Sequence, residues 1–195
     1  GMRLIINYRG NWDVIHREII NKFPYAQKEL YERYGLIPHN LCGQDILAEI
    51  PKLYYADGDR IEAYKGYNII PKRHKMGYRS IHYTVCFKGV YVEIQVRTIY
   101  DEAWSDCDHN YVYKQDENKS HTALEQLSQI LCQLTNISND MGESMREIFE
   151  KESIIDQRDG TWKTTKECLD IFDESLIRIK CACNELQNFR TKLTD

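Results

Sequence analysis

Two stretches of alternating residues, joined by two turn residues, limit the folds open to this chain. Apolar side chains alternate with polar ones from Ile81 to Phe87 and again from Val90 to Val96. A period of two predicts β-strands with one buried face. Lys88-Gly89 lies between the two runs and predicts a two-residue hairpin turn. We therefore expect a β-hairpin at the centre of the fold.

The register of this hairpin follows from its turn. If Phe87 pairs with Val90, then Ile81 pairs with Val96, and all the apolar side chains fall on one face. A slip of one residue would mix the two faces, so the pattern fixes the register. The opposite face then carries Ser80, His82, Thr84, Glu93, Gln95 and Arg97. Two interpretations of this polar face stay open from the pattern alone, a solvated surface or a functional site.

Shorter elements are expected before the hairpin. Residues 3–8 have the pattern of a strand, and Asn11 is a candidate N-cap for a helix over residues 12–23. Proline and glycine then punctuate the chain, and short helices are expected at residues 27–34 and 44–49. Residues 51–77 are expected to form a strand fragment and a long loop.

Helices are expected after the hairpin. Thr98 and Asp101 fit a capping box that begins a helix running to Tyr113. Its stripe of Glu102, Asp106 and His109 is open to two interpretations, contact with a ligand or metal, or a solvated face. We expect an α+β fold, a mixed β-sheet flanked by helices over residues 1–115, with a C-terminal helical extension over residues 116–195.

The extension carries two apolar stripes separated by a break near Gly160. The first is Leu124, Leu127, Leu131 and Leu134, and the second is Leu169, Phe172, Leu176, Ile179, Cys183 and Leu186. Their spacing of three and four residues is typical of a coiled coil or helix bundle. The stripes indicate either an intramolecular core or the interface of a homo-oligomer.

Composition and charge exclude several classes of protein. Hydrophobic residues make up 42% of the 195 residues, yet no apolar run reaches the length of about 18 that a membrane helix needs. The net charge of −4 argues against a general nucleic-acid binder. Seven irregularly spaced cysteines predict reduced thiols and a cytoplasmic location.

One stretch departs from this acidic balance. Five cations and no acidic residue lie between positions 65 and 79, and they are Lys65, Lys72, Arg73, Lys75 and Arg79. Such a stretch attracts an anionic ligand such as a polyphosphate. The alternative is a solvated basic loop.

Three blocks of residues occur in a fixed order. Pro71-Lys72 and GYRSIH (residues 77–82) come first, VEIQVRT (residues 92–98) follows, and Trp104, His109 and Tyr113-Lys114 come last. In order and content they resemble the synthetase domain of the RelA/SpoT family. The resemblance covers roughly residues 1–115 and implies a nucleotidyltransferase-like core. Family members transfer pyrophosphate from ATP to the 3′-hydroxyl of GTP or GDP, which makes the alarmone (p)ppGpp of the stringent response.

The resemblance implies a role for each matching residue. Tyr78 matches the tyrosine that stacks on guanine, and Lys72 and Lys75 both qualify as the lysine that holds the guanosine phosphates. Glu93 matches the carboxylate that acts on the 3′-hydroxyl and helps to hold Mg²⁺. The remaining expected nucleotide-binding residues are Arg79, Ser80, His82, Gln95 and Arg97.

The family pattern also includes segments that we expect to lie upstream of this chain. Gly1-Met2-Arg3 matches the end of a D-x-x-G-x-R pattern whose aspartate is a second Mg²⁺ ligand. The basic stretch that grips ATP precedes that pattern in the family. We therefore expect the full native protein to be a GTP pyrophosphokinase, and this chain to carry the guanine half but not the ATP half. Two alternatives stay open: an inactive domain that binds guanine nucleotide or alarmone, and a family toxin that modifies tRNA or adenine nucleotides.

Overall fold

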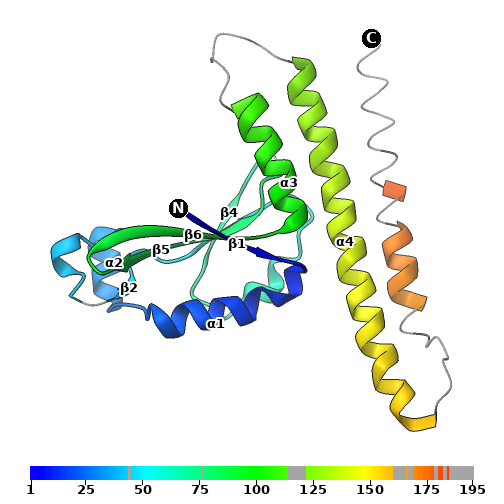
Figure 1. The fold of residues 1–195 in the computed structure, drawn as a ribbon, viewed down its shortest axis with the longest axis horizontal. Coiled ribbons are helices and arrows are strands. Elements are labelled where there is room, and N and C mark those ends of the chain that lie inside the picture. Colours follow the sequence, from blue (N-terminus) through cyan, green and yellow to red (C-terminus); the bar gives the residue numbers. More distant parts are fainter. Residues whose placement is uncertain are drawn as a thin grey trace. The chain divides into compact units, whose positions relative to one another are not determined.

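The computed structural model describes residues 1–43, 45–75, 77–113, 122–159, 166, 169–177, 180, 181 and 184 (Figure 1). The chain divides into two compact units, Gly1–Ser105 and Asp106–Asp195. The predicted boundary between residues 115 and 116 lies outside the described residues and stays a prediction. Among the described residues, no helix is both long enough and apolar enough to cross a membrane.

The first unit is built on a mixed sheet of six strands. The strands are β1 (Met2–Ile6), β2 (Ile46–Leu47), β3 (Lys52–Tyr55), β4 (Ile70–Arg73), β5 (Ser80–Phe87) and β6 (Val90–Thr98). The order of five strands in the sheet is β1-β6-β5-β3-β4. The sixth strand, β2, also pairs with β5. The β1/β6 and β3/β4 pairs are parallel, whereas β5 pairs antiparallel with β6, β3 and β2. The predicted α+β fold with a mixed sheet is confirmed.

The central hairpin has the predicted register. Phe87 pairs with Val90, His82 with Gln95, and Ile81 with Val96. Lys88 and Gly89 both have positive φ angles, 48° and 75°, which is the requirement of a type I′ turn. This turn matches the twist of the two strands, although lysine adopts a positive φ less readily than asparagine or glycine.

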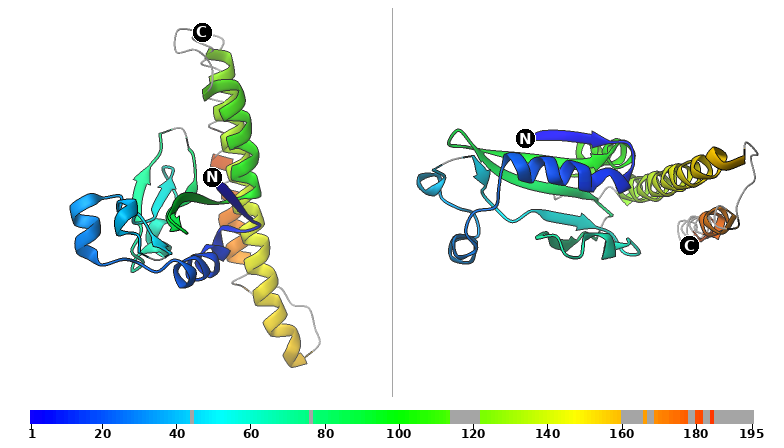
Figure 2. Two further views of the ribbon diagram at one scale, coloured as in Figure 1. Left: turned by 60° about the vertical axis from the view of Figure 1, so that its left-hand side comes forward. Right: turned by 90° about the horizontal axis from the view of Figure 1, so that it is seen from below.

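Helix α1 (Trp12–Lys22) covers the apolar face of the sheet, as Figure 1 and Figure 2 show. Trp12 and Ile19 of α1 pack in one buried cluster with Ile81, Tyr83 and Val96 of the hairpin. Burial of one such side chain contributes about 1.5–3 kcal/mol. Asn11 takes the predicted N-cap position of α1 but makes no side-chain capping hydrogen bond.

The opposite face of the sheet is covered near the hairpin turn. Helix α2 (Lys28–Tyr34) and the segment after it contribute Tyr31 and Ile37 to a second buried cluster, which contains Cys86 of β5. The 3₁₀ helix η2 (His39–Leu41) also lies here, and His39 stacks on Tyr91 of β6 with ring centroids 3.7 Å apart. This packing confines the polar part of the face to the other end of the hairpin.

Two predictions before the hairpin are wrong. Residues 44–49 do not form a helix, because Ile46 and Leu47 pair with Cys86 and Val85 as strand β2 and are both buried; Gln44 itself lies outside the described residues. The expected long loop contains η3 (Ile61–Tyr64), a 3₁₀ helix, and strand β4. The parallel pairing of β4 with β3 forms through the tertiary fold and leaves no alternating signal in the sequence.

The predicted capping box after the hairpin is confirmed. The Thr98 hydroxyl accepts a hydrogen bond from the Asp101 backbone N–H at 3.1 Å, and Asp101 Oδ2 accepts from the Thr98 hydroxyl at 2.8 Å. Helix α3 (Ile99–Asp108) begins here and passes into a π-helical turn, η4 (His109–Tyr113). The 3₁₀ turn η1 (Arg9–Asn11) precedes α1.

The second unit contains the long helix α4 (Thr122–Asp159). Leu127 and Leu134 of the first predicted stripe are 61% and 46% exposed, so the stripe forms no buried core here. In the second stripe Leu169, Phe172 and Leu176 are also exposed, while Ile179, Cys183, Leu186 and the expected break at Gly160 lie outside the described residues. A homo-oligomer through these helices stays a prediction. The described cysteines, Cys42, Cys86, Cys107, Cys132 and Cys181, are free thiols.

Candidate functional site

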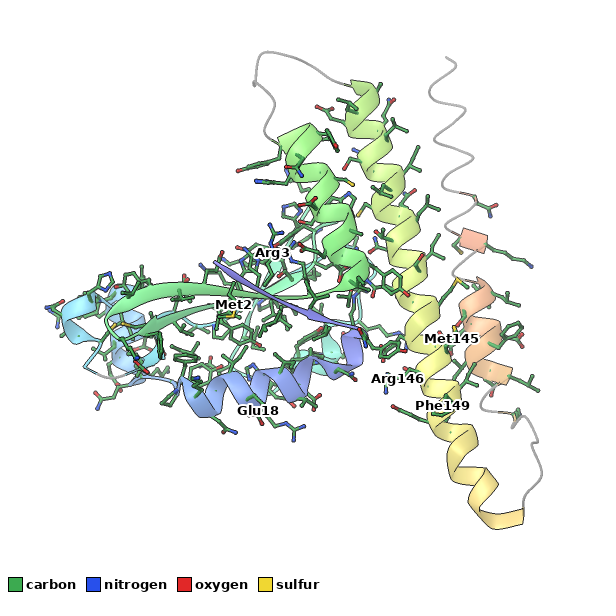
Figure 3. The ribbon with its side chains drawn as sticks, viewed as in Figure 1. Met2, Arg3, Glu18, Met145, Arg146 and Phe149 are labelled. Carbon is green, nitrogen blue, oxygen red and sulfur yellow. The ribbon has the colours of Figure 1, made fainter. Side chains whose placement is uncertain are left out.

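Strand register brings most of the predicted site residues onto one face of the sheet. Side chains that face one another across paired strands lie on the same side. His82 pairs with Gln95, which pairs in turn with Arg3 of β1. Tyr54 of β3 pairs with Ser80 and also with Lys72 of β4. This face lies opposite α1, and Figure 3 shows Arg3 on that side.

A chain of hydrogen bonds joins Tyr78 to Glu93 through His82. Glu93 Oε1 lies 3.0 Å from His82 Nδ1, and the Tyr78 hydroxyl lies 2.8 Å from His82 Nε2. An ionised carboxylate only accepts hydrogen bonds, so His82 donates from Nδ1. Nε2 of the neutral ring then accepts from the Tyr78 hydroxyl. Both nitrogens of His82 are therefore engaged by the protein.

A second arm reaches the other oxygen of Glu93. Gln95 Nε2 donates to Glu93 Oε2 at 2.8 Å, and Gln95 Oε1 accepts from Arg97 Nη2. The Arg97 guanidinium also lies over the ring of Tyr78, with its carbon 5.2 Å from the ring centroid. Tyr78 and Glu93 are thus linked along two routes, one through His82 and one through Arg97 and Gln95.

Arg97 itself is held by helix α3. Its Nη1 donates to Ser105 Oγ at 2.7 Å and lies 3.2 Å from Glu102 Oε2 in an ion pair. Arg3 Nη1 donates to the other oxygen of Glu102 at 2.6 Å. The Arg97 side chain is only 3% exposed, and its Nε is a buried donor without an acceptor among the described residues.

Aromatic rings surround Tyr78. The ring of Tyr54 lies 5.7 Å from it, that of His74 5.4 Å and that of Trp104 6.4 Å, measured between centroids. The backbone N–H of Tyr78 also donates to His74 Nδ1 at 3.3 Å. The half-buried tyrosine is therefore held in one orientation, which is what a platform for a planar ligand needs.

Burial changes the acid–base properties of two residues in this cluster. It raises the pKa of the Tyr78 hydroxyl, although the charge of Arg97 opposes this shift. Burial also lowers the pKa of His82, against the opposing charge of Glu93, and the charges of Arg97 and Lys52 lower it further. Both residues are thus neutral near pH 7, in agreement with the hydrogen-bond roles given above.

The basic stretch is less positive than the sequence indicates. Arg79 Nε lies 2.9 and 2.7 Å from the two carboxylate oxygens of Asp59, and Arg73 pairs with both oxygens of Asp57. The Asp57 carboxyl has its pKa held below the usual value by hydrogen bonds from Arg73. Lys72 and Lys75 are exposed, and they remain the phosphate-binding candidates of the predicted set.

Two other predicted residues do not reach the surface of the site. Ser80 is 4% exposed and donates its hydroxyl to the Val96 carbonyl oxygen at 3.2 Å. Arg97 is buried as described above. The register prediction put both on the polar face correctly, but a register does not say how deeply a side chain is buried. Arg97 is buried against Glu102 and Ser105 of helix α3.

Comparison with known proteins gives the family. A family model described as "Region found in RelA / SpoT proteins" matches residues 1–118. The chain belongs to the RelA/SpoT family. A structure titled "Structure of a GTP Pyrophosphokinase Family Protein from Streptococcus pneumoniae" is similar at 15% identity and a TM-score of 0.42, and the match covers 80% of this chain and 64% of that one. No curated protein matches the chain.

In this RelA/SpoT chain, two contacts at the site were not expected from the sequence. Tyr54 flanks both Tyr78 and His82, and its ring centroid lies 4.6 Å from that of His82. Arg3 of β1 was expected only as the end of the D-x-x-G-x-R pattern, and its contact with Glu102 of α3 was not expected. The apolar–polar pattern gives no sign of either residue. Their positions follow from the β3/β5 and β1/β6 pairings, which join segments far apart in the sequence.

The donor set of this RelA/SpoT site fits a magnesium ion shared with a polyphosphate. Mg²⁺ in phosphoryl-transfer sites is usually held by one or two carboxylates together with phosphate oxygens and water. Glu93 supplies one carboxylate, and its side chain is 43% exposed. Among the described residues no group of three histidine, cysteine or acidic side chains forms a cage for a metal. Glu93 is therefore the carboxylate of the Tyr78–His82 cluster that would hold such an ion.

Proposed function

We propose that this chain is the guanine-nucleotide part of a GTP pyrophosphokinase, which transfers pyrophosphate from ATP to the 3′-hydroxyl of GTP or GDP. The observation that carries this proposal is the double link between Tyr78 and Glu93. A ring suited to stacking on a base and a carboxylate suited to accepting a proton lie on one polar face, joined by hydrogen bonds through His82. Membership of the RelA/SpoT family supports this choice of substrates.

The guanine base stacks on Tyr78 in this proposal. Stacking of a base on an aromatic ring contributes about 1–3 kcal/mol. Lys72 and Lys75 are exposed on or just after β4, and they neutralise the phosphates of the bound nucleotide. His82 and Gln95 act through Glu93, because their polar atoms already contact its carboxylate oxygens.

Glu93 accepts the proton of the 3′-hydroxyl as that oxygen attacks the β-phosphorus of ATP. A bond forms between the 3′-oxygen and the β-phosphorus, the bond from that phosphorus to the α-phosphate oxygen breaks, and AMP leaves. A ribose hydroxyl is a weak nucleophile, so a positioned base contributes to the rate. Bound Mg²⁺ would offset the negative charge of the phosphates, with Glu93 as its protein ligand.

Pyrophosphate transfer tests the proposal. The chain is incubated with ATP labelled on its β-phosphate, GTP and Mg²⁺, and a labelled guanosine product is sought beside Glu93→Gln. The glutamine keeps the size and the hydrogen-bonding oxygen of the side chain but cannot take a proton. Any transfer that the parent chain catalyses should therefore fall by about 10²–10⁴-fold in the variant. Equal product from both chains would contradict the role of Glu93.

A second function is favoured by one observation. Glu93 contacts the neutral His82 and is in no ion pair with an arginine among the described residues, whereas Glu102 pairs with both Arg3 and Arg97. A single carboxylate binds a metal weakly on its own, so we expect nucleotide binding to persist under conditions in which transfer is not measurable. Saturable GTP binding without product would assign the chain a binding function. A cytoplasmic location and an ATP partner are parts of the same proposal and stay predictions.

A further inference from the structure

Arg97 occupies an unusual position for a charged side chain. It lies beneath the polar face with 3% of its side chain exposed. Removal of a charge from water costs several kcal/mol unless the charge is paired and hydrogen-bonded. The contacts that hold Arg97 in place therefore indicate what it does at the site.

The partners of Arg97 come from two sides. On the helix side, Glu102 neutralises the guanidinium and Ser105 accepts from Nη1. On the strand side, Nη2 donates to Gln95 Oε1 and the guanidinium carbon lies over the ring of Tyr78, 5.2 Å from its centroid. The planar fork of arginine is suited to such a set of contacts, because one rigid group both stacks and donates in fixed directions.

One of these contacts fixes the orientation of an amide. A guanidinium has no acceptor, so the group of Gln95 that faces Arg97 must be its oxygen. The Gln95 nitrogen is then turned toward Glu93 Oε2, 2.8 Å away. Without Arg97 no hydrogen bond to Gln95 Oε1 fixes the orientation of the amide, and Glu93 then lacks a fixed donor.

We propose that Arg97 is a positioning residue that holds the Tyr78 ring and the Gln95 amide, and that it does not touch the nucleotide. This inference rests on the proposed guanine-nucleotide function of the site. It replaces the direct nucleotide contact that the family motif implies for this arginine. A residue that positions Tyr78 affects base stacking and therefore the binding of every guanine ligand. A residue that binds phosphate affects only ligands that carry phosphate.

Binding of guanosine and of GTP separates these two roles. Affinities of both ligands are measured for the parent chain, Arg97→Met and Arg97→Lys. The methionine keeps apolar volume, and the lysine keeps the charge but loses the planar fork. We expect both variants to lose at least about fivefold in affinity for both ligands, because stacking on Tyr78 serves each of them equally.

A matched variant gives the opposite pattern. Lys72→Met removes an exposed cation, and we expect it to weaken GTP but to leave guanosine unchanged. If the Arg97 variants follow the Lys72 pattern, with a loss for GTP only, Arg97 is a phosphate ligand and the proposal is overturned. Equal affinities of the Arg97 variants and the parent chain for both ligands would also overturn it.

A ligand-free measurement keeps the inference separate from the proposed function. The side-chain amide protons of Gln95 are followed by NMR, and we expect their shifts to move and their exchange with solvent to quicken in Arg97→Met. If the parent chain binds neither ligand, the proposed function fails, and this signal alone decides whether Arg97 positions Gln95. An unmoved Gln95 signal overturns the inference. Should Arg97→Met fail to fold, Ser105→Ala removes one anchor of the guanidinium and carries the same prediction with a smaller loss.

Discussion

His82 Nδ1 lies 3.0 Å from Glu93 Oε1, and this contact determines which nitrogen of the ring carries the proton. Because the carboxylate accepts, Nδ1 donates, and Nε2 is left to accept from Tyr78. The histidine thereby connects the proposed base-stacking ring with the proposed proton acceptor. Glu93 is oriented by this donor even before any ligand is bound.

This contact predicts a difference between two substitutions of His82. Asn places an amide nitrogen near the position of Nδ1, whereas Gln places one near Nε2. Mg²⁺ should raise the affinity for GTP in the parent chain. We expect this rise to be several-fold larger in His82→Asn than in His82→Gln. The measurement is GTP affinity with and without Mg²⁺ for both variants. The same Mg²⁺ dependence in the two variants would show that the Nδ1 donor is unimportant.

The Asp57–Arg73 pair predicts a gain of affinity. Asp57 withdraws one cation of the basic stretch from an anionic ligand, so Asp57→Asn should strengthen GTP binding severalfold at most, and less so at high salt. Glu18→Gln is the matched control, because it removes the same charge from α1, which carries no residue of the basic stretch (Figure 3). An equal rise in both variants would point to net charge rather than to release of Arg73.

A buried histidine predicts loss of stability in acid. His16 is 5% exposed, its Nδ1 lies 3.0 Å from the Tyr83 hydroxyl, and burial lowers its pKa below 6.5. The unfolded chain therefore binds a proton first as the pH falls below about 6.5. The stability is fully present above that pH and is lost as the pH falls toward the folded pKa, by at most about 1.4 kcal/mol per pH unit for one group.

Urea unfolding at pH 7.5 and 5.5 tests this dependence. His16→Gln keeps a polar group near Tyr83 but does not titrate, so its free energy of unfolding should fall less between the two pH values than that of the parent chain. The lowered pKa of His82 also reduces stability in acid, but it does so equally in the parent chain and in His16→Gln. Parallel pH dependences would rule out His16 as the source.

The capping box predicts a stability effect that one pair of variants isolates. Thr98 is 1% exposed and exchanges hydrogen bonds with Asp101. Thr98→Ser and Thr98→Ala both lose the methyl group, but only the alanine loses the hydroxyl. We expect the alanine variant to be less stable than the serine variant by about 1 kcal/mol. Equal unfolding midpoints would mean that the hydroxyl does not cap α3.

The hairpin was predictable from the sequence because its information is local. Alternation over residues 81–96 and a two-residue turn determine which side chains share a face, and the pairing of His82 with Gln95 follows from that count alone. The capping box at Thr98 is equally local. Strand β2 was mistaken for a helix because its two residues are too few to show a period. Strand β4 was missed because its partner, β3, lies well before it in the chain.

At the candidate site, too, local features were predictable and contacts formed by the fold were not. Membership of the polar face was predicted correctly for His82, Glu93 and Gln95. The burial and the ion pairs of the arginines were not predicted, because they depend on how other segments fold over the strands. Asp59 binds Arg79 from 20 residues away, and Glu102 binds Arg97 only because helix α3 turns back toward β6. No pattern along the chain indicates that two of the expected nucleotide-binding arginines are already paired inside the protein.

Nucleotide binding to the parent chain and to Tyr78→Ala tests whether a guanine base stacks on Tyr78. GTP and ATP are titrated into both chains, with Tyr34→Ala as the control, because Tyr34 is a tyrosine of α2 that is 39% exposed. We expect saturable GTP binding that weakens about tenfold or more in Tyr78→Ala and is unchanged in Tyr34→Ala. GTP affinity that is the same in all three chains would contradict this expectation.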